Sequence, residues 1–140
     1  MNLSIKQNDC QYYVDEANRK VICVIDDTRD LFFDYIDDFK LDLRVNDKFW
    51  HKLFMPHRFV GIATCSENDT FDVEIGKKIA FHKAKTKLNT SFFKRAQIYI
   101  NKVDEEFTKI LDNFNDFGER LSNNANRREA AIEKLLNKEE

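Results

Sequence analysis

The sequence predicts an α+β fold in which an N-terminal antiparallel β-sheet is followed by long C-terminal α-helices that form an oligomer interface. Residues 1–68 contain short runs of β-branched and aromatic residues, which are typical of strands. From Asp72 onward, apolar residues recur at spacings of three and four, which is the period of a helix. The 140 residues include only 3 glycines and 1 proline, so long helices are favoured over tight turns. A chain of this length is expected to form a single domain, 1–140.

The expected sheet comes from four runs within residues 1–68, the mainly β part of the chain. CQYYV and KVICVI are expected to form a hairpin across the turn DEANR. KFWHKLFM and RFVGIATC follow as two more expected strands, with Pro56 marking the turn between them. The aspartate-rich segment 26–47 is compatible with either an irregular loop or a short helix.

A long helix is expected over residues 69–121. Its start is indicated by three good capping residues, Asp69, Thr70 and Asp72. Three further cap-forming residues at 89–91 predict either a bend there or two helices in tandem. The run GERLSNNAN is expected to interrupt the pattern after Phe117, and residues 127–138 are expected to form a short terminal helix.

A continuous stripe of residues, called the seam below, follows this helix at three-and-four spacing. The seam consists of Ile75, Ile79, His82, Thr86, Asn89, Phe93, Ala96, Ile100, Val103, Phe107, Ile110, Phe114, Phe117 and Leu121. A small sheet is too short to cover a stripe of this length, so parallel or antiparallel pairing between subunits is expected. The residues expected at the subunit contact are Phe93, Ile100, Val103, Phe107, Ile110, Phe114 and Phe117.

Three polar residues, His82, Thr86 and Asn89, interrupt the seam and are called its polar stretch. One explanation is that they set the register of the pairing, as a buried asparagine does in coiled coils. The other is a wet pocket at the subunit contact, because three buried polar groups without partners would each cost about 1–3 kcal/mol. Basic residues, including Lys85 and Arg95, crowd beside the polar stretch, and two rings, Phe81 and Phe92, flank it. Cations and ring faces together suit a nucleotide.

The sequence gives little support for catalysis, a metal or a cofactor. The histidines have no nucleophile or acid at a recognisable spacing, and a phosphate-cradling glycine-rich loop is missing. The three cysteines have no metal-ligand spacing and are odd in number, which favours a reducing cytosolic setting. No secretory leader and no run of about 18 apolar residues is present, so a soluble protein that is not exported is expected. The expected activity is therefore binding, with no catalytic residues.

The segment FVGIATCSENDTFDVEIGKKIAFHKAKTK, residues 59–87, resembles a segment of small phage and prophage proteins. The layout of an N-terminal antiparallel sheet and long C-terminal helices is similar to that of the phage anti-Thoeris sponge family. This family binds cyclic ADP-ribose signals made by bacterial TIR-domain enzymes and holds them uncleaved in pockets between subunits. The resemblance implies an anti-defence protein that acts in the cytoplasm of the infected bacterial host.

The resemblance also implies counterparts of the family's ligand contacts at Arg58, Phe81 and Asn89. Lys102 and Lys109 stand in the region where the family has a further arginine. With the residues of the polar stretch and its neighbours, the expected ligand-binding set is Arg58, Phe81, His82, Lys85, Thr86, Asn89, Phe92 and Arg95.

Rival functions remain open at the level of sequence. A nucleic-acid-binding inhibitor of a host defence complex, of the anti-CRISPR kind, would use the same basic helix, and its binding would fall steeply with salt. A DNA mimic would use the aspartate-rich segment 26–47. A structural helix-bundle protein of a phage would need no ligand.

Overall fold

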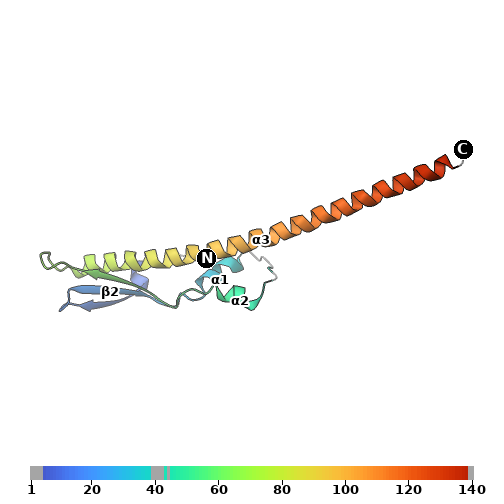
Figure 1. Cartoon of the computed structure of the whole chain (residues 1–140). Coiled ribbons are helices and arrows are strands. Elements are labelled where there is room, and N and C mark those ends of the chain that lie inside the picture. Colours follow the sequence, from blue (N-terminus) through green and yellow to red (C-terminus); the bar gives the residue numbers. More distant parts are fainter. Residues whose placement is uncertain (1–4, 39–42, 44, 139–140) are drawn as a thin grey trace. The chain divides into compact units, whose positions relative to one another are not determined.

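The computed structural model describes residues 5–38, 43 and 45–138. It confirms the predicted α+β class: an N-terminal three-stranded antiparallel sheet is followed by a long C-terminal helix (Figure 1). The chain forms two compact units, Met1–Ile100 and Asn101–Glu140. The first unit holds the sheet and the start of the helix, and the second consists of the rest of the helix.

The sheet has the strand order β1-β2-β3, and both pairs of neighbours are antiparallel. Its strands are β1 (Gln11–Asp15), β2 (Lys20–Ile25) and β3 (Phe59–Thr64). The predicted hairpin across DEANR is confirmed as β1 and β2, and the fourth predicted run is confirmed as β3. In this register Cys23 of β2 lies between Tyr12 of β1 and Gly61 of β3.

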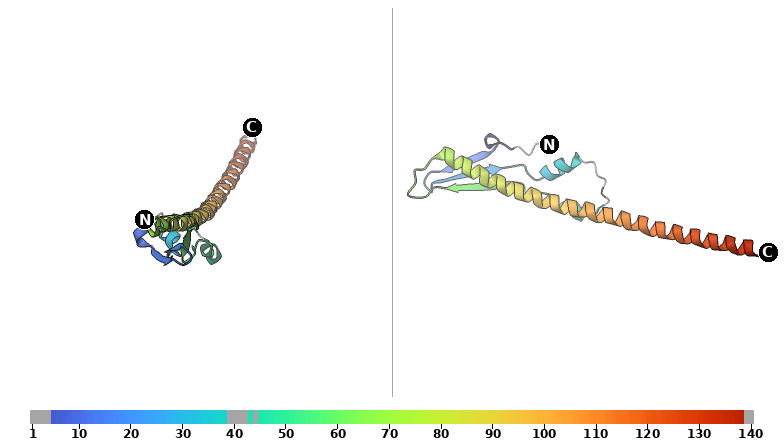
Figure 2. Two further views of the ribbon diagram at one scale, coloured as in Figure 1. Left: turned by 90° about the vertical axis from the view of Figure 1, so that its left-hand side faces the viewer. Right: turned by 90° about the horizontal axis from the view of Figure 1, so that it is seen from above.

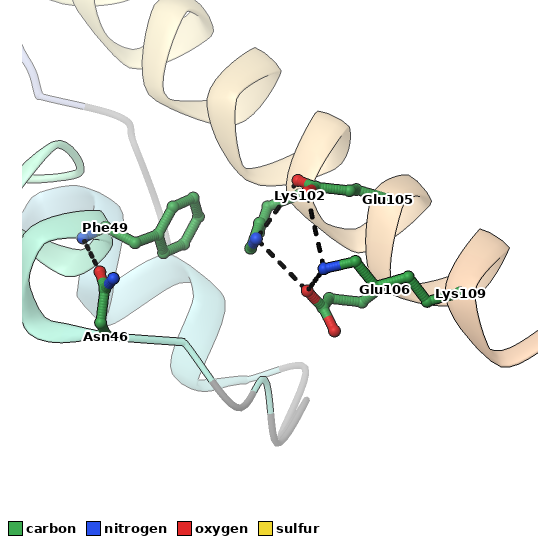
Figure 3. Close-up of polar contacts among 6 residues, drawn as sticks. All are labelled: Asn46, Phe49, Lys102, Glu105, Glu106 and Lys109. Carbon is green, nitrogen blue, oxygen red and sulfur yellow. Dashed lines mark hydrogen bonds and ion pairs between the residues drawn. The ribbon is translucent and has the colours of Figure 1, made fainter.

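The predicted strand KFWHKLFM is wrong, because this run contains a short helix, α2 (Asp47–His51). Asn46 caps α2, since its side-chain oxygen accepts a hydrogen bond from the backbone N–H of Phe49 at 3.1 Å (Figure 3). Within segment 26–47, a second short helix forms, α1 (Leu31–Asp37), while residues 39–42 and 44 lie outside the described residues. A single 3₁₀ turn, η1 (Gln7–Asp9), precedes β1.

The last helix, α3, runs from Val73 to Asn137. The expected cap is confirmed at Asp72, whose Oδ1 accepts hydrogen bonds from the backbone N–H groups of Glu74 and Ile75 at 2.9 and 3.2 Å. Residues 89–91 lie within α3, so two helices in tandem are not formed there. The helix also continues without a break to Asn137. The expected interruption over 118–126 and the expected separate helix over 127–138 are therefore not formed. A glycine inside a helix costs only about 1 kcal/mol, which a helix of 65 residues tolerates.

Within the first unit, α3 lies along one face of the sheet (Figures 1 and 2). Small residues make this approach very close. A Cβ atom on Gly61 would collide with the carbonyl oxygen of Ala80 and would lie 2.5 Å from the backbone nitrogen of Ala84. A Cβ atom on Gly76 would lie 2.6 Å from Cγ2 of Val21. The backbone of α3 therefore touches β3 directly, with no side chain between them.

Aromatic rings join α1 to α3 within the first unit. The ring centroid of Phe92 lies 5.2 Å from that of Phe32 and 5.3 Å from that of Tyr35, both in edge-to-face geometry. Phe32 also meets the ring of Tyr99 at 6.0 Å. Phe32, Phe92 and Tyr99 are buried, so this cluster extends the core beyond the end of the sheet.

Candidate functional site

A groove opens beside the outer edge of β3, on the flank of α3. It has a volume of about 670 Å³ and is lined by Ile62, Ile79, His82, Lys83, Thr86 and Lys87. Two residues of the predicted polar stretch, His82 and Thr86, are therefore exposed at this groove. Two half-exposed isoleucines supply its apolar wall. The groove thus combines cations, polar groups and apolar surface in one place.

Two lysines cross from α3 to the edge strand. The Nζ of Lys83 donates a hydrogen bond to the carbonyl oxygen of Ile62 at 2.9 Å. The Nζ of Lys87 donates to the carbonyl oxygen of Val60 at 2.7 Å. Both lysines belong to the basic residues beside the polar stretch, but the sequence does not indicate these contacts, because the partners on β3 are more than twenty residues away.

The seam faces solvent in the first unit. Ile75, Ile79 and Phe93 are exposed, and Phe93 retains 73% of its accessible surface. The buried face of α3 is a different stripe, made of Ala80, Ala84, Leu88, Ser91, Phe92 and Tyr99. The sheet therefore covers the alanine-rich stripe and leaves the seam uncovered.

The seam also faces solvent in the second unit, considered by itself. Every residue from Phe107 to Lys138 is exposed. The large apolar side chains among them that belong to the seam are Phe107, Ile110, Phe114, Phe117 and Leu121. An exposed apolar series of this kind is typical of a surface that another helix covers.

Two of the predicted ligand-binding residues have roles in the fold instead. Phe92 is 8% exposed and lies in the aromatic cluster, so it offers no ring face to a ligand. Arg95 is half-buried, and its guanidinium donates to the carbonyl oxygen of Phe54 at 3.2 Å and to the hydroxyl of Ser91 at 2.7 Å. The spacing of the seam placed both residues beside the polar stretch, but the rotation of the helix turns them toward the core.

Three other predicted ligand-binding residues lie away from the groove. Lys85 donates to the carbonyl oxygen of Ile5 at 3.0 Å, on the β1 side of α3, whereas the groove is on the β3 side. Phe81 is partly buried, and its ring lies 5.6 Å from that of His82. Arg58 precedes β3 and pairs with Asp26 at 3.8 Å. The structure of one chain therefore does not gather the whole predicted set.

The polar stretch itself is exposed, as a site in contact with solvent requires. The hydroxyl of Thr86 donates to the carbonyl oxygen of His82 at 2.8 Å, which leaves its lone pairs to accept further hydrogen bonds. Asn89 is exposed one turn further along α3. None of these three side chains is buried in the core.

The charges of α3 differ between its two parts. From Ile75 to Val103 the helix contains no acidic residue. Further along, acids and bases alternate and pair: Lys102 lies 3.2 Å from Glu105, and Glu106 lies 3.3 Å from both Lys102 and Lys109 (Figure 3). Hydrogen bonds from the lysines lower the pKa of Glu106, and hydrogen bonds to the glutamates raise the pKa of Lys102. The lysines of the groove have no such neighbours on their own helix.

Outside the groove, Asp26, Asp27 and His57 come together, which the sequence did not predict. Their ligand atoms all lie within 4.8 Å of one another, and Nε2 of His57 is 3.3 Å from Oδ1 of Asp26. Exposed acidic groups of this kind are common without an ion, and the guanidinium of Arg58 already pairs with Asp26. His51 and His82 lie elsewhere, against the rings of Phe54 and Phe81.

A third cluster contains thiols near the β1–β2 hairpin. Burial raises the pKa of Cys10 to about 11 and also raises the pKa values of Tyr12 and Cys23. These groups are therefore neutral near pH 7, and the two thiols are poor nucleophiles there.

Comparison of the chain with family models, with curated proteins and with solved structures gives no match. Among the described residues, the structure contains no helix that is both long and apolar enough to cross a membrane.

Proposed function

We propose that this chain is a non-catalytic binding protein that self-associates through the seam and sequesters a small anionic nucleotide of the cyclic ADP-ribose type. In this proposal it is a phage anti-defence protein that removes the signal of a TIR-domain enzyme in the cytoplasm of the infected host. The observation that carries the proposal is the groove, where Lys83, Lys87, His82 and Thr86 are exposed together.

The chemistry of the groove suits a nucleotide. Lysine binds phosphate as a point charge, and hydroxyl and imidazole groups can hydrogen-bond ribose or base edges. The apolar surface of Ile62 and Ile79 is available for the flat face of a base. Phe92 belongs to the core, and Phe81 does not line the groove, although its ring lies 5.6 Å from that of the lining residue His82.

Self-association is part of the proposal because exposed apolar residues continue the seam on both sides of the polar stretch. Within the first unit, Ile75 and Ile79 precede it and Phe93 follows it. A second copy that covers these residues also covers the polar stretch, which reduces solvent access to a bound ligand. Binding in a partly desolvated site strengthens each charged contact.

The test is to purify the protein from cells that express an active TIR-domain enzyme, denature it, and analyse the released small molecules by mass spectrometry. We expect one intact cyclic nucleotide to be released in near-stoichiometric amount. His82→Ala with Thr86→Ala should reduce retention at least about tenfold, since each lost polar anchor weakens binding by about 1 kcal/mol or more. Thr108→Ala with Asn115→Ala, also exposed on α3, is the matched control and should retain the ligand.

Two results would contradict the proposal. Release of no nucleotide, combined with no heat of binding when cyclic ADP-ribose is titrated, would show that the chain is not a sponge. Release of a converted product would show that the protein is an enzyme.

A second function, binding of nucleic acid, is favoured by one specific observation. The part of α3 without acids carries exposed lysines outside the groove as well, at positions 78 and 94. Phosphate contacts spread along a helix would make the affinity for DNA or RNA fall steeply with salt. Micromolar DNA binding that weakens at least about a hundredfold between 50 and 200 mM salt would favour this function over the sponge.

A further inference from the structure

The lysines of the groove are bound to the free edge of the sheet. Among the described strands, β3 is the last in the order β1-β2-β3, so one of its edges has no neighbouring strand. The carbonyl groups of Val60 and Ile62 point to this edge, since Lys87 and Lys83 reach them at 2.7 and 2.9 Å. The lysines therefore occupy the place where a further strand would donate its N–H groups.

This arrangement fixes the separation of two positive charges. Residues two apart on a strand are about 6.6 Å apart, so the ammonium groups bound to the carbonyls of Val60 and Ile62 are held at a similar separation. Each ammonium has three donors, and each of these bonds uses one. Lys83 and Lys87 both line the groove, and two donors of each ammonium remain for another acceptor.

Neither charge is neutralised by an acid in the part of the chain that the structure describes. Other lysines of α3 do have acidic partners: Lys77 lies 3.0 Å from Glu74, and Lys109 lies 3.3 Å from Glu106. A neutral carbonyl satisfies a hydrogen-bond donor but leaves the charge of Lys83 and of Lys87 uncompensated. An anion would accept a hydrogen bond from each ammonium and would also compensate its charge.

We propose that Lys83 and Lys87 form the oxyanion-binding pair of the groove, and that they bind the phosphate groups of its ligand. The separation lets one phosphate bridge the two ammonium groups or lets each ammonium bind one phosphate of a diphosphate. The inference rests on the proposed function for the identity of the nucleotide, but the anion pair itself needs only a phosphate. It replaces the basic residues expected from the sequence, since Arg58, Lys85 and Arg95 are engaged elsewhere.

An alternative role for these lysines is to protect an edge strand. Lysine on a free edge discourages pairing with another chain, and that role needs no ligand. The two roles differ in what happens when the charge is removed. Loss of an anion site weakens phosphate binding, whereas loss of edge protection leaves phosphate binding unchanged and promotes aggregation.

The experiment is calorimetry of the full chain with three probes: cyclic ADP-ribose, inorganic pyrophosphate and orthophosphate. Wild type should bind pyrophosphate, and Lys83→Gln with Lys87→Gln should weaken the binding of pyrophosphate and of cyclic ADP-ribose at least about tenfold each. Lys83→Arg with Lys87→Arg keeps both charges and should restore most of the affinity. Lys78→Gln with Lys94→Gln removes two exposed lysines of the same helix outside the groove, and it should stay within about twofold of wild type.

The outcomes separate this inference from the proposed function. If wild type binds pyrophosphate through the two lysines but does not bind cyclic ADP-ribose, the anion pair stands and the sponge function falls. If cyclic ADP-ribose binds and the glutamine variant binds it equally well, the sponge function stands and the anion pair is wrong. Aggregation of the glutamine variant with unchanged affinity of its soluble fraction also overturns the anion pair. If wild type binds none of the three probes, both proposals are wrong.

Discussion

The part of α3 in the first unit and the part in the second differ in how they are stabilised. Within the first unit, Ala80, Ala84 and Leu88 lie on the buried face of the helix, and from Ile75 onward this part carries bases without acids. In the second unit, every residue from Phe107 to Lys138 is exposed, and ion pairs join successive turns near its start. Where tertiary packing stabilises the helix, its charged residues need not pair with one another.

The same comparison explains where binding residues are found. An unpaired lysine costs the first part little, because the sheet supplies most of the stability. The second part has no sheet, so ion pairs and, in the proposed assembly, association through the seam have to stabilise it. The proposed function therefore assigns ligand binding to the packed part and assembly to the exposed part.

The largest expected effect contrasts two adjacent phenylalanines. Phe92→Ala removes a ring from the aromatic core and should lower the free energy of unfolding by about 4 kcal/mol. Phe93→Ala removes an exposed ring of the seam and should change it by less than about 0.5 kcal/mol. Both should be measured by urea denaturation in a background with Phe107→Glu and Phe114→Glu, so that association does not contribute. Equal effects of the two substitutions would show that the faces of α3 are assigned wrongly.

The next prediction concerns assembly. Replacement of Phe107 and Phe114 by glutamate should weaken self-association at least about a hundredfold, because each buried phenylalanine contributes about 1.5–3 kcal/mol. Thr108→Glu with Asn115→Glu adds the same charge at the same spacing, one position off the seam, and should leave association intact. Sedimentation equilibrium at micromolar concentration measures both. A monomeric wild type would show that the exposed seam of the second unit does not mediate assembly.

A smaller effect is expected from a matched pair of glycine substitutions. Gly61→Ala places a Cβ against the backbone of Ala80 and Ala84 and should destabilise the first unit by about 1–3 kcal/mol. Gly118→Ala meets nothing within 4 Å and should stabilise the helix by up to about 1 kcal/mol. Hydrogen exchange of the two units separates the effects. Destabilisation by both changes would mean that the second unit is also tightly packed.

The smallest effect is the pH dependence of the ion pairs. The pKa of Glu106 is lowered in the folded helix, so its contribution to stability is present above the ordinary glutamate pKa and is lost as the pH falls through the lowered value. A carboxyl titration followed by NMR should give Glu106 a midpoint below that of the Lys102→Met and Lys109→Met variant.

The sequence predicted the hairpin, β3 and the start of α3, because turn residues and the Asp72 cap are local signals. The strand predicted over α2 was wrong. The run from Lys48 to Met55 is rich in apolar and aromatic residues, which indicates a strand, and the helix is indicated only by the cap at Asn46. The sequence of the aspartate-rich segment did not distinguish a loop from a helix, because α1 depends on the packing of Phe32 against α3. Local propensity cannot report such a contact.

The site was predicted less completely than the fold. The periodicity of the seam identified His82 and Thr86 as unusual, and both are exposed at the groove. The second stripe of α3 was missed because alanines carry little hydrophobic signal, so Phe92 was expected to flank the polar stretch and to bind the ligand. The positions of the Lys83 and Lys87 side chains depend on hydrogen bonds to carbonyl groups of a strand that is distant in sequence. The pattern of side chains in a sequence does not indicate backbone acceptors.

The contact between Gly61 and α3 has a consequence for affinity. Because backbone touches backbone there, the distance from the helix to the edge of β3 cannot adjust by a change of rotamer. The four-carbon stems of Lys83 and Lys87 span that fixed distance, so the cations are positioned before any ligand arrives. A preorganised site spends little of its binding free energy on ordering side chains, so the proposed anion pair is expected to bind its ligand tightly.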